Sequence, residues 1–272
     1  GFFVEGVILG VGLCIVTLRG LEYALYPAHG EDHASAFHFP FTFWLGEAFS
    51  GLSIDTLENL IYLVAMIKIV ISFAWMIVIS LNTTMGVAWH RFTAFFNIWF
   101  KRESSGRTAL GAVKPLTSAG KAITLDDIDD LDEDSVLGVG QIEDFSWKGI
   151  LDFTSCTECG RCQSQCPAWN TDKPLSPKLL ITALRDHAHA KAPYLQAAEG
   201  DRATLLADDP ALAKEADRPL IGDTGDDWFY MPEDGSAVID PDVLWSCTSC
   251  GACVQQCPVD IEHVDHIVDM RR

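Results

Sequence analysis

The sequence predicts a mainly α-helical chain in which transmembrane helices are followed by a water-soluble, cysteine-rich helical domain. Two long apolar runs lie in the first third of its 272 residues, and two copies of one four-cysteine motif lie in the second half. Charge is divided in the same way, since 8 of the 38 acidic residues precede Lys114 and 30 follow it. The formal net charge of −19 therefore belongs mostly to the part of the chain that follows the apolar runs.

The two apolar runs cover about residues 2–25 and 57–81. A helix that crosses the hydrocarbon core of a bilayer needs about 20 predominantly apolar residues, and both runs are long enough. A buried helix of a soluble protein is the alternative for either run. Glu5 and Lys68 are ionisable residues inside the runs, where such groups either serve a function or extend toward the membrane surface. Cys14 is expected to pack as a small apolar residue.

Basic residues predict the orientation of these helices. Residues 26–56 contain no Lys or Arg, whereas Lys101, Arg102 and Arg107 follow the second run. The positive-inside rule then places the 26–56 loop outside and the cysteine-rich part in the cytoplasm of a multi-pass protein of the cell (inner or plasma) membrane. Cytoplasmic thiols stay reduced, which suits a chain with nine cysteines.

A further helix is expected to continue to about residue 100. Its aromatic residues recur at helical spacing: Trp89, Phe92, Phe96 and Trp99. Such a stripe is typical of an interfacial or packing face, and we assign residues 1–102 to the membrane region. Residues 103–143 have little periodicity and contain the acidic run 126–134, so they are expected to form an acidic linker.

The motif C-x2-C-x2-C-x3-C-P occurs twice in residues 144–272. It is the ligand pattern of two-cluster bacterial ferredoxins, in which the fourth cysteine binds the other cluster. We therefore predict an α-helical two-[4Fe–4S] ferredoxin-like domain. One cluster is assigned to Cys156, Cys159, Cys162 and Cys257, and the other to Cys247, Cys250, Cys253 and Cys166. Zinc usually takes two ligand pairs, and disulfides need an oxidising compartment, so both alternatives fit less well.

Other features complete the prediction for this domain. Gly160 and Gly251 follow the second Cys of each motif, where a positive φ turns backbone N–H groups toward the cluster. Ser176 before Pro177 predicts the start of a helix to Ala192. An insertion at about residues 186–240 is expected to end in a short strand at 236–239. His263 and His266, after the last cysteine, are expected at the surface.

His90 and Arg91 follow the second apolar run at its cytoplasmic end. An axial imidazole and a guanidinium that pairs with a propionate would suit a haem b, although an interfacial His–Arg pair is an equally simple alternative. No nucleophile with its base and no phosphate-binding loop stands out, so no catalytic residue is expected. The acidic surface argues against nucleic acid as a partner.

Three segments, residues 144–148, 156–169 and 245–269, resemble membrane iron–sulfur reductases of actinobacteria. These are similar to the D-type subunit of heterodisulfide reductase fused to a nitrate-reductase-gamma-like haem b domain, and are of the electron-transfer-flavoprotein:menaquinone oxidoreductase type. The resemblance implies a quinone-linked oxidoreductase of a respiratory chain. Electrons would pass from a cytoplasmic flavoprotein through two [4Fe–4S] clusters toward haem b and menaquinone.

The same resemblance extends from His90 to Arg102 and implies that His90 binds haem. Proteins of this family have additional N-terminal spans and C-terminal CCG domains, so the sequence is expected to be a fragment that carries the relay part. The alternative function is that of a membrane-tethered ferredoxin, which docks a soluble redox partner without haem or quinone chemistry.

Overall fold

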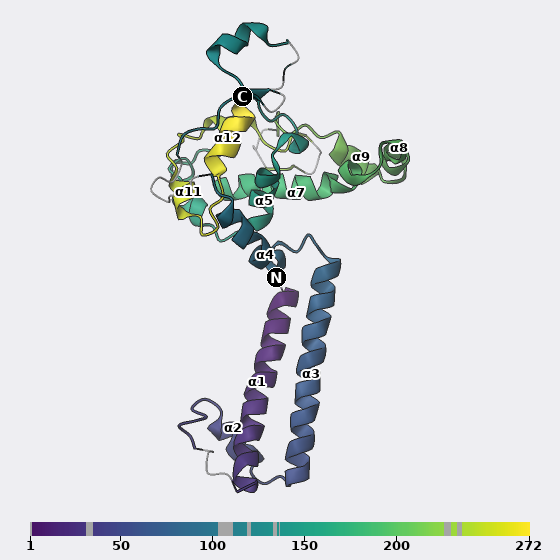
Figure 1. The fold of residues 1–272 in the computed structure, drawn as a ribbon, viewed down its shortest axis with the longest axis vertical. Coiled ribbons are helices and arrows are strands. Elements are labelled where there is room, and N and C mark those ends of the chain that lie inside the picture. Colours follow the sequence, from purple (N-terminus) through teal and green to yellow (C-terminus); the bar gives the residue numbers. More distant parts are fainter. Residues whose placement is uncertain are drawn as a thin grey trace. The chain divides into compact units, whose positions relative to one another are not determined.

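The protein is mainly α-helical, and two long apolar helices precede the cysteine-rich domain, so the expected fold class is confirmed. The computed structural model describes residues 2–30, 35–102, 111–118, 121–132, 135, 137–225, 230–232 and 236–272. The chain forms two compact units, Gly1–Ala88 and Trp89–Arg272 (Figure 1).

The first unit contains two long helices, α1 (Phe2–Ala28) and α3 (Ile54–Leu81), which lie side by side (Figure 1). Both are long and apolar enough to cross a membrane, with mean hydropathies of 2.0 and 2.4 over their most apolar windows. Only 6% of each window is buried within the structure. This exposure does not match the alternative of a buried soluble helix, because a core helix covers its apolar side chains with protein.

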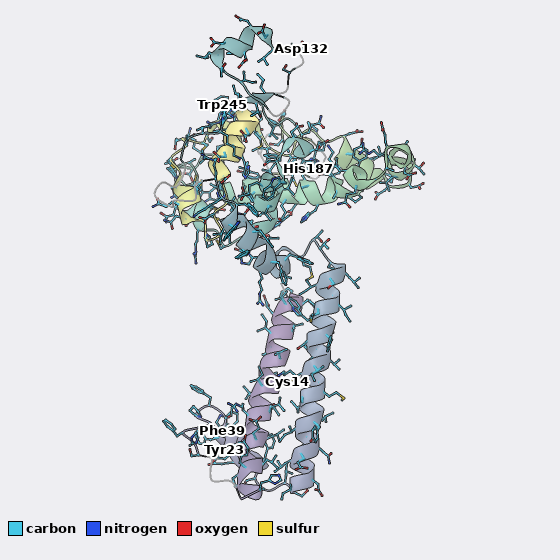
Figure 2. The ribbon with its side chains drawn as sticks, in the orientation of Figure 1. Cys14, Tyr23, Phe39, Asp132, His187 and Trp245 are labelled. Carbon is cyan, nitrogen blue, oxygen red and sulfur yellow. The ribbon has the colours of Figure 1, made fainter. Side chains whose placement is uncertain are left out.

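A short helix, α2 (Phe43–Phe49), packs on α1 at the end where the two long helices are joined. The rings of Tyr23 and Phe39 meet edge to face at 5.7 Å, and Figure 2 shows them together beside α1. Cys14 is buried in α1, in keeping with its expected role as a small apolar residue. Glu5 is exposed and Lys68 is half-buried.

Most of helix α4 (Gly86–Trp99) belongs to the second unit, which begins at Trp89. The Asn97 side chain is fully buried, and its amide donates hydrogen bonds of 2.8 Å to Asp152 Oδ1 and to the Val259 carbonyl. A buried amide needs such partners, so Asn97 fixes α4 to this unit. Helical spacing alone could not reveal them.

The second unit is built from short helices around one apolar core. Its elements are β1 (Thr117–Ser118), β2 (Lys121–Ala122), η1 (Leu125–Asp130), η2 (Ile142–Asp144), α5 (Trp147–Ser155), α6 (Arg161–Ser164), η3 (Trp169–Thr171), α7 (Pro177–Gln196), α8 (Glu199–Asp208), α9 (Pro210–Ala216), α10 (Pro241–Trp245), α11 (Ala252–Gln256) and α12 (His263–Arg271). Phe153, Leu180, Leu184 and Leu244 lie in the core, so α5, α7 and α10 enclose it. Ser176 caps α7 as expected, accepting a hydrogen bond from the Leu179 N–H at 3.2 Å.

Two parts of this unit differ from the sequence-based expectation. The segment expected as a linker carries β1, β2, η1 and η2, and at its end Ile142 is buried in the core. The prediction of a strand at 236–239 was wrong. Among these described residues, only Ile239 forms a β-bridge, an isolated parallel one with Ile221. Asp240 follows at once and caps α10, which ends the extended segment.

Gly138 is expected to tolerate no side chain, because the backbone of α12 passes close to it. An added Cβ would lie 2.5 Å from the Asp269 carbonyl oxygen, and the Val139 N–H already donates to that oxygen at 2.8 Å. We expect Gly138→Ala to destabilise the unit by about 1–3 kcal/mol through overpacking. Thermal unfolding of the detergent-solubilised protein measures this effect. Gly140→Ala is the matched control, because its nearest neighbour, Asp144 Oδ2, is 3.8 Å away.

Equal unfolding midpoints for the Gly138 and Gly140 variants would contradict this account of the contact.

Candidate functional site

The two cysteine motifs fold into the same local structure. Gly160 and Gly251 have φ values of 78° and 75° and begin helices α6 and α11. Glu158 and Ser249, two residues earlier, also have positive φ, of 57° and 53°. A non-glycine residue in this region is strained, and such strain is concentrated at functional sites. The repeated conformation therefore indicates that both motifs are shaped for the same task.

This conformation turns backbone N–H groups toward thiols, as the glycines predicted. The Glu158 N–H points to Cys156 Sγ at 3.5 Å, and the Ser249 N–H points to Cys247 Sγ at 3.3 Å. Donors placed in this way stabilise negative charge on sulfur. These N–H groups oppose the effect of burial, which raises the pKa of Cys156 and Cys247.

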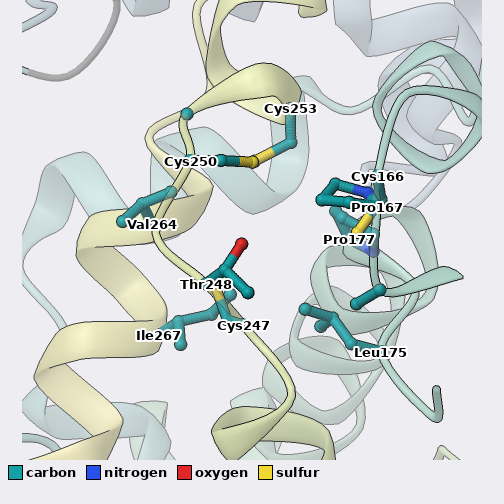
Figure 3. A pocket seen from close by; sticks show the side chains of 12 residues that line it. Cys166, Pro167, Leu175, Pro177, Cys247, Thr248, Cys250, Cys253, Val264 and Ile267 are labelled. Atoms are coloured by element: carbon teal, nitrogen blue, oxygen red, sulfur yellow. The ribbon is translucent and has the colours of Figure 1, made fainter. Parts of the chain in front are cut away.

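One cavity is bordered by Cys166 from the first motif and by Cys247, Cys250 and Cys253 from the second. Its other walls include Leu175, Val264 and Ile267. Figure 3 shows Cys166 and Pro167 on one side of this cavity, across from Cys250. Pro167 ends the first motif, and the chain places Cys166 beside the second.

Another cavity shows the reciprocal arrangement. It is bordered by Cys156, Cys159 and Cys162 from the first motif and by Cys257 from the second. The structure thus brings together the same two sets of four cysteines that the Cys-Pro endings suggested. We call the set with Cys257 the first site and the set with Cys166 the second site.

The residues fit an iron–sulfur cube better than a single ion. Among the residues that the structure describes, no three His, Cys, Asp or Glu side chains are gathered to hold one metal ion. A structural zinc would need four ligands within about 2.0–2.3 Å of one point. Four thiols that border one cavity from two motifs instead suit a cluster with an iron atom at each corner.

Burial raises the pKa of five of the motif thiols, those of Cys156, Cys162, Cys247, Cys253 and Cys257. Burial, and then the charges of Cys156 and Cys257, raise the pKa of Cys162 to about 12. Burial also raises the pKa of Cys257 to about 11, and it raises the pKa of Cys253 further. Because metal ligands must be thiolates, cluster assembly releases the protons of these thiols and depends on the positive charge that iron supplies.

The two sites adjoin one another within the unit. Cys162 of the first site and Cys253 of the second belong to one small apolar cluster, which also contains Val264. Val264 is buried and borders the cavity of the second site. One cysteine from each site therefore packs in the same small apolar cluster.

A buried carboxylate, which the sequence did not reveal, supports both motifs. Asp152 is fully buried and accepts hydrogen bonds from Lys148 Nζ at 2.7 Å and His266 Nε2 at 2.8 Å, in addition to the bond from Asn97. Burial acts to raise the pKa of Asp152, but His266 and Lys148 outweigh it and lower the pKa to about 2. Asp152 therefore joins α4, α5 and α12 as a charged residue.

His263 and His266 are buried, so the expectation that they lie at the surface was wrong. His266 packs edge to face against Phe145 and Phe153, and these apolar partners were not visible from its polar neighbours in sequence. His263 borders the cavity of the first site, and its Nδ1 lies 2.9 Å from the Ile261 carbonyl. Burial, and then the charge of His266, lower the pKa of His263 to about 4, so it is neutral at physiological pH.

His90 lies near the first site. Its Nδ1 is 3.2 Å from the carbonyl of Ser155, the residue before Cys156. Arg91 is exposed. His90 is therefore half-buried on the side of α4 that faces the second unit, and the structure does not bring it together with a second described imidazole as ligands of one metal.

Comparison with known proteins agrees with this geometry. Residues 155–261 match the family described as "4Fe-4S dicluster domain". The chain therefore contains a ferredoxin-type dicluster domain with eight motif cysteines and two [4Fe–4S] clusters, as predicted. Together with α1 and α3, this domain defines the chain as an iron–sulfur electron-transfer protein with two apolar anchor helices.

The relatives extend the likeness to the membrane region. The chain is 31% identical to the "EtfAB:quinone oxidoreductase" of Syntrophomonas wolfei over 274 residues, which is 100% of the chain and 33% of the relative. It is 33% identical to a "probable membrane-anchored ferredoxin" of Chromohalobacter salexigens, over 69% of the chain and 26% of the relative. It is 38% identical to the "probable iron-sulfur-binding oxidoreductase FadF" of Bacillus subtilis, over 58% of the chain and 22% of the relative.

The chain thus spans a third or less of the length of these curated relatives. No solved structure matches it. The chain is related to EtfAB:quinone oxidoreductase and corresponds to a ferredoxin-like relay part of such oxidoreductases.

Proposed function

We propose that the chain relays electrons from a cytoplasmic flavoprotein of the electron-transfer-flavoprotein kind toward a membrane quinone. The observation that carries this proposal is the pair of adjoining four-cysteine cavities in one compact unit. The relative named for its action on EtfAB and quinone, which aligns with the whole chain, supports the choice of donor and acceptor. Menaquinone is the quinone that the resemblance to the actinobacterial reductases suggests.

In this proposal, Cys156, Cys159, Cys162 and Cys257 hold one cluster, and Cys247, Cys250, Cys253 and Cys166 hold the other. When bound, the clusters supply one-electron transfer. The chain contributes their spacing, through Cys162 and Cys253, and their electrostatic environment, through the Glu158 and Ser249 N–H groups. No described residue is proposed to act as a catalytic acid, base or nucleophile.

Electron paramagnetic resonance of membranes that contain the full-length protein tests the proposal. The clusters should be reduced when reduced electron-transfer flavoprotein is added, and reoxidised when a menaquinone analogue follows. A variant with Cys159 and Cys250 both changed to Ala should show neither response. Failure of the quinone to reoxidise clusters that a soluble acceptor does reoxidise would favour the second candidate, a membrane-anchored ferredoxin without quinone chemistry, for which one relative is named.

We further propose that α1 and α3 span the cell membrane with the clusters on the cytoplasmic side. Cysteines introduced at two exposed apolar residues, Phe37 and Val113, test this orientation. In intact cells, a membrane-impermeant thiol reagent should label Phe37→Cys and leave Val113→Cys unlabelled, because no Lys or Arg lies in the 26–56 loop. The unsubstituted protein corrects for its own thiols. Labelling of Val113→Cys alone would reverse the orientation.

His90 remains a proposed haem b ligand in the full-length protein, with Arg91 as the proposed partner of a propionate. Its Nδ1 lies beside the Ser155 carbonyl, which is the kind of partner that orients a metal-bound imidazole. We expect His90→Ala to remove one b-type haem and leave both clusters assembled, as measured by redox difference spectra and iron content. Arg91→Lys is the control, since it keeps the charge. Unchanged haem content would exclude this role.

A further inference from the structure

We propose that an aromatic face on the second unit lies on the phospholipid surface. This contact places the first site nearer to the membrane than the second site. The aromatic face is defined by residues Phe92, Phe95, Phe96, Trp99, Phe100 and Trp147. This inference rests on the proposed membrane anchoring of α3, and it goes further by naming the surface and the order of the two sites.

The side chains of this face are exposed to an unusual degree for large apolar residues. Phe95, Trp99 and Trp147 are 62%, 71% and 63% exposed, and the remaining three members are 48–58% exposed. Phe92, Phe95, Phe96 and Trp99 recur at the spacing of one face of α4, where the rings of Phe95 and Trp99 stack at 6.1 Å. Phe100 directly follows this helix, and its ring meets that of Trp147 at 5.1 Å. Contiguous apolar patches of this kind mark protein or membrane contacts.

The opposite side of α4 is fixed to the protein, so the helix cannot turn its aromatic side inward. His90, Ala94 and Asn97 face the unit, where Asn97 is tied to Asp152 and Val259, and Ala94 packs on the core. Just beyond the helix, Nε and Nη2 of Arg102 donate hydrogen bonds to the two carboxylate oxygens of Asp265, at 2.9 and 3.0 Å.

The chain itself limits what can cover this face. Helix α3 has 28 residues and is about 42 Å long, which exceeds the hydrocarbon core of about 30 Å. It ends at Leu81, and α4 begins at Gly86, so the connection reaches at most about 18 Å when fully extended. If α3 spans the membrane, α4 must therefore begin in or beside the lipid headgroup layer.

The chemistry of the face suits that layer. Phe and Trp are favoured at the membrane–water boundary, where an amphipathic helix lies in the plane of the surface. Phe95, Ile98 and Trp99 also line an apolar hollow together with Lys101, whose ammonium is paired with Asp260 at 3.2 Å, so the hollow offers apolar contacts to an acyl chain. A phospholipid surface is thus the occupant that the exposure, the tether and the hollow jointly favour.

The order of the two sites follows from the residues that α4 holds. Ser155, which His90 contacts, precedes Cys156, and Val259, which Asn97 contacts, comes two residues after Cys257. Both segments belong to the first site. The second site is instead supported from α12, where Arg271 Nη2 donates to the Cys247 carbonyl at 2.7 Å. The first site is therefore the membrane-side site.

Photocrosslinking tests the surface in the full-length protein reconstituted into vesicles of phosphatidylcholine and phosphatidylglycerol. Benzoylphenylalanine placed at Phe95 should form phospholipid adducts, whereas the same probe at Trp245, which is 68% exposed on α10, should not. A probe at Phe73 on α3 reports the anchoring itself. Adducts at Phe73 without adducts at Phe95, adducts of Phe95 with a second copy or a soluble protein, or equal adducts at Phe95 and Trp245 would each overturn the proposal. If phospholipid adducts were absent at Phe73 as well as at Phe95, the proposed membrane anchoring of α3 would be wrong.

Spin-labelled phospholipids test the order of the sites. With a nitroxide at the headgroup, the protein that retains only the first cluster, Cys166→Ala, should enhance nitroxide relaxation several-fold more than the protein that retains only the second, Cys257→Ala. Equal or reversed enhancement would overturn the order. Phe95→Ser combined with Trp99→Ser leaves both cysteine sets intact and should weaken the enhancement, which distinguishes docking from cluster loss.

Discussion

Replacing Cys166 with alanine is expected to remove the cluster of the second motif and, with it, half of the cluster iron. Cys166 stands in the first motif, yet it borders the cavity of Cys247, Cys250 and Cys253. A [4Fe–4S] cluster that loses one thiolate loses a corner ligand, and the affinity of such centres depends on every ligand. Electron paramagnetic resonance and iron analysis of the full-length protein should therefore show the first-site cluster alone.

Cys14→Ala is the matched control, because Cys14 is a buried cysteine outside both motifs and its loss should leave iron unchanged. Cys257→Ala should give the reciprocal result and retain the second-site cluster. If Cys166→Ala instead altered only the signal of the first-site cluster, the exchange of fourth ligands between motifs would be wrong.

Replacing Asp152 with alanine is expected to lower the free energy of unfolding by about 3–5 kcal/mol, the usual cost of removing one partner of a buried ion pair. The variant leaves the Lys148 ammonium, which is 8% exposed, without its carboxylate. It also removes an acceptor from Asn97 and His266. Chemical denaturation of the detergent-solubilised protein at neutral pH measures the loss.

Chemical denaturation is done at neutral pH because of the direction in which folding shifts the pKa of Asp152. The folded pKa of Asp152, about 2, is below its ordinary value of 3.8, so the charged form favours the folded state. This contribution, about 2 kcal/mol, is complete above pH 3.8 and is lost as the pH falls through 2. Asp208→Ala, at an exposed residue of α8, should change stability by less than about 0.5 kcal/mol. An equally small effect at Asp152 would refute its role as the joint between α4, α5 and α12.

The sequence was most informative where one short pattern dictates both chemistry and local structure. The eight cysteines and their spacing predicted the dicluster domain, and the glycines after each second Cys predicted the left-handed turns found at Gly160 and Gly251. Apolar length likewise located α1 and α3 within a few residues. In each case the determining contacts lie within a few residues along the chain, or between the helix and its solvent.

Tertiary structure decided the features that depend on contacts between distant segments. Asn97 lies 55 residues before Asp152 and 162 residues before Val259 in the sequence. Only the folded structure showed that these three residues form one buried joint. The same joint fixes α4 to the second unit and leaves its aromatic side exposed, while His266 is buried beside Phe145 and Phe153. A polar residue is buried only when partners satisfy its hydrogen bonds, and a single sequence does not show which distant residues those partners will be.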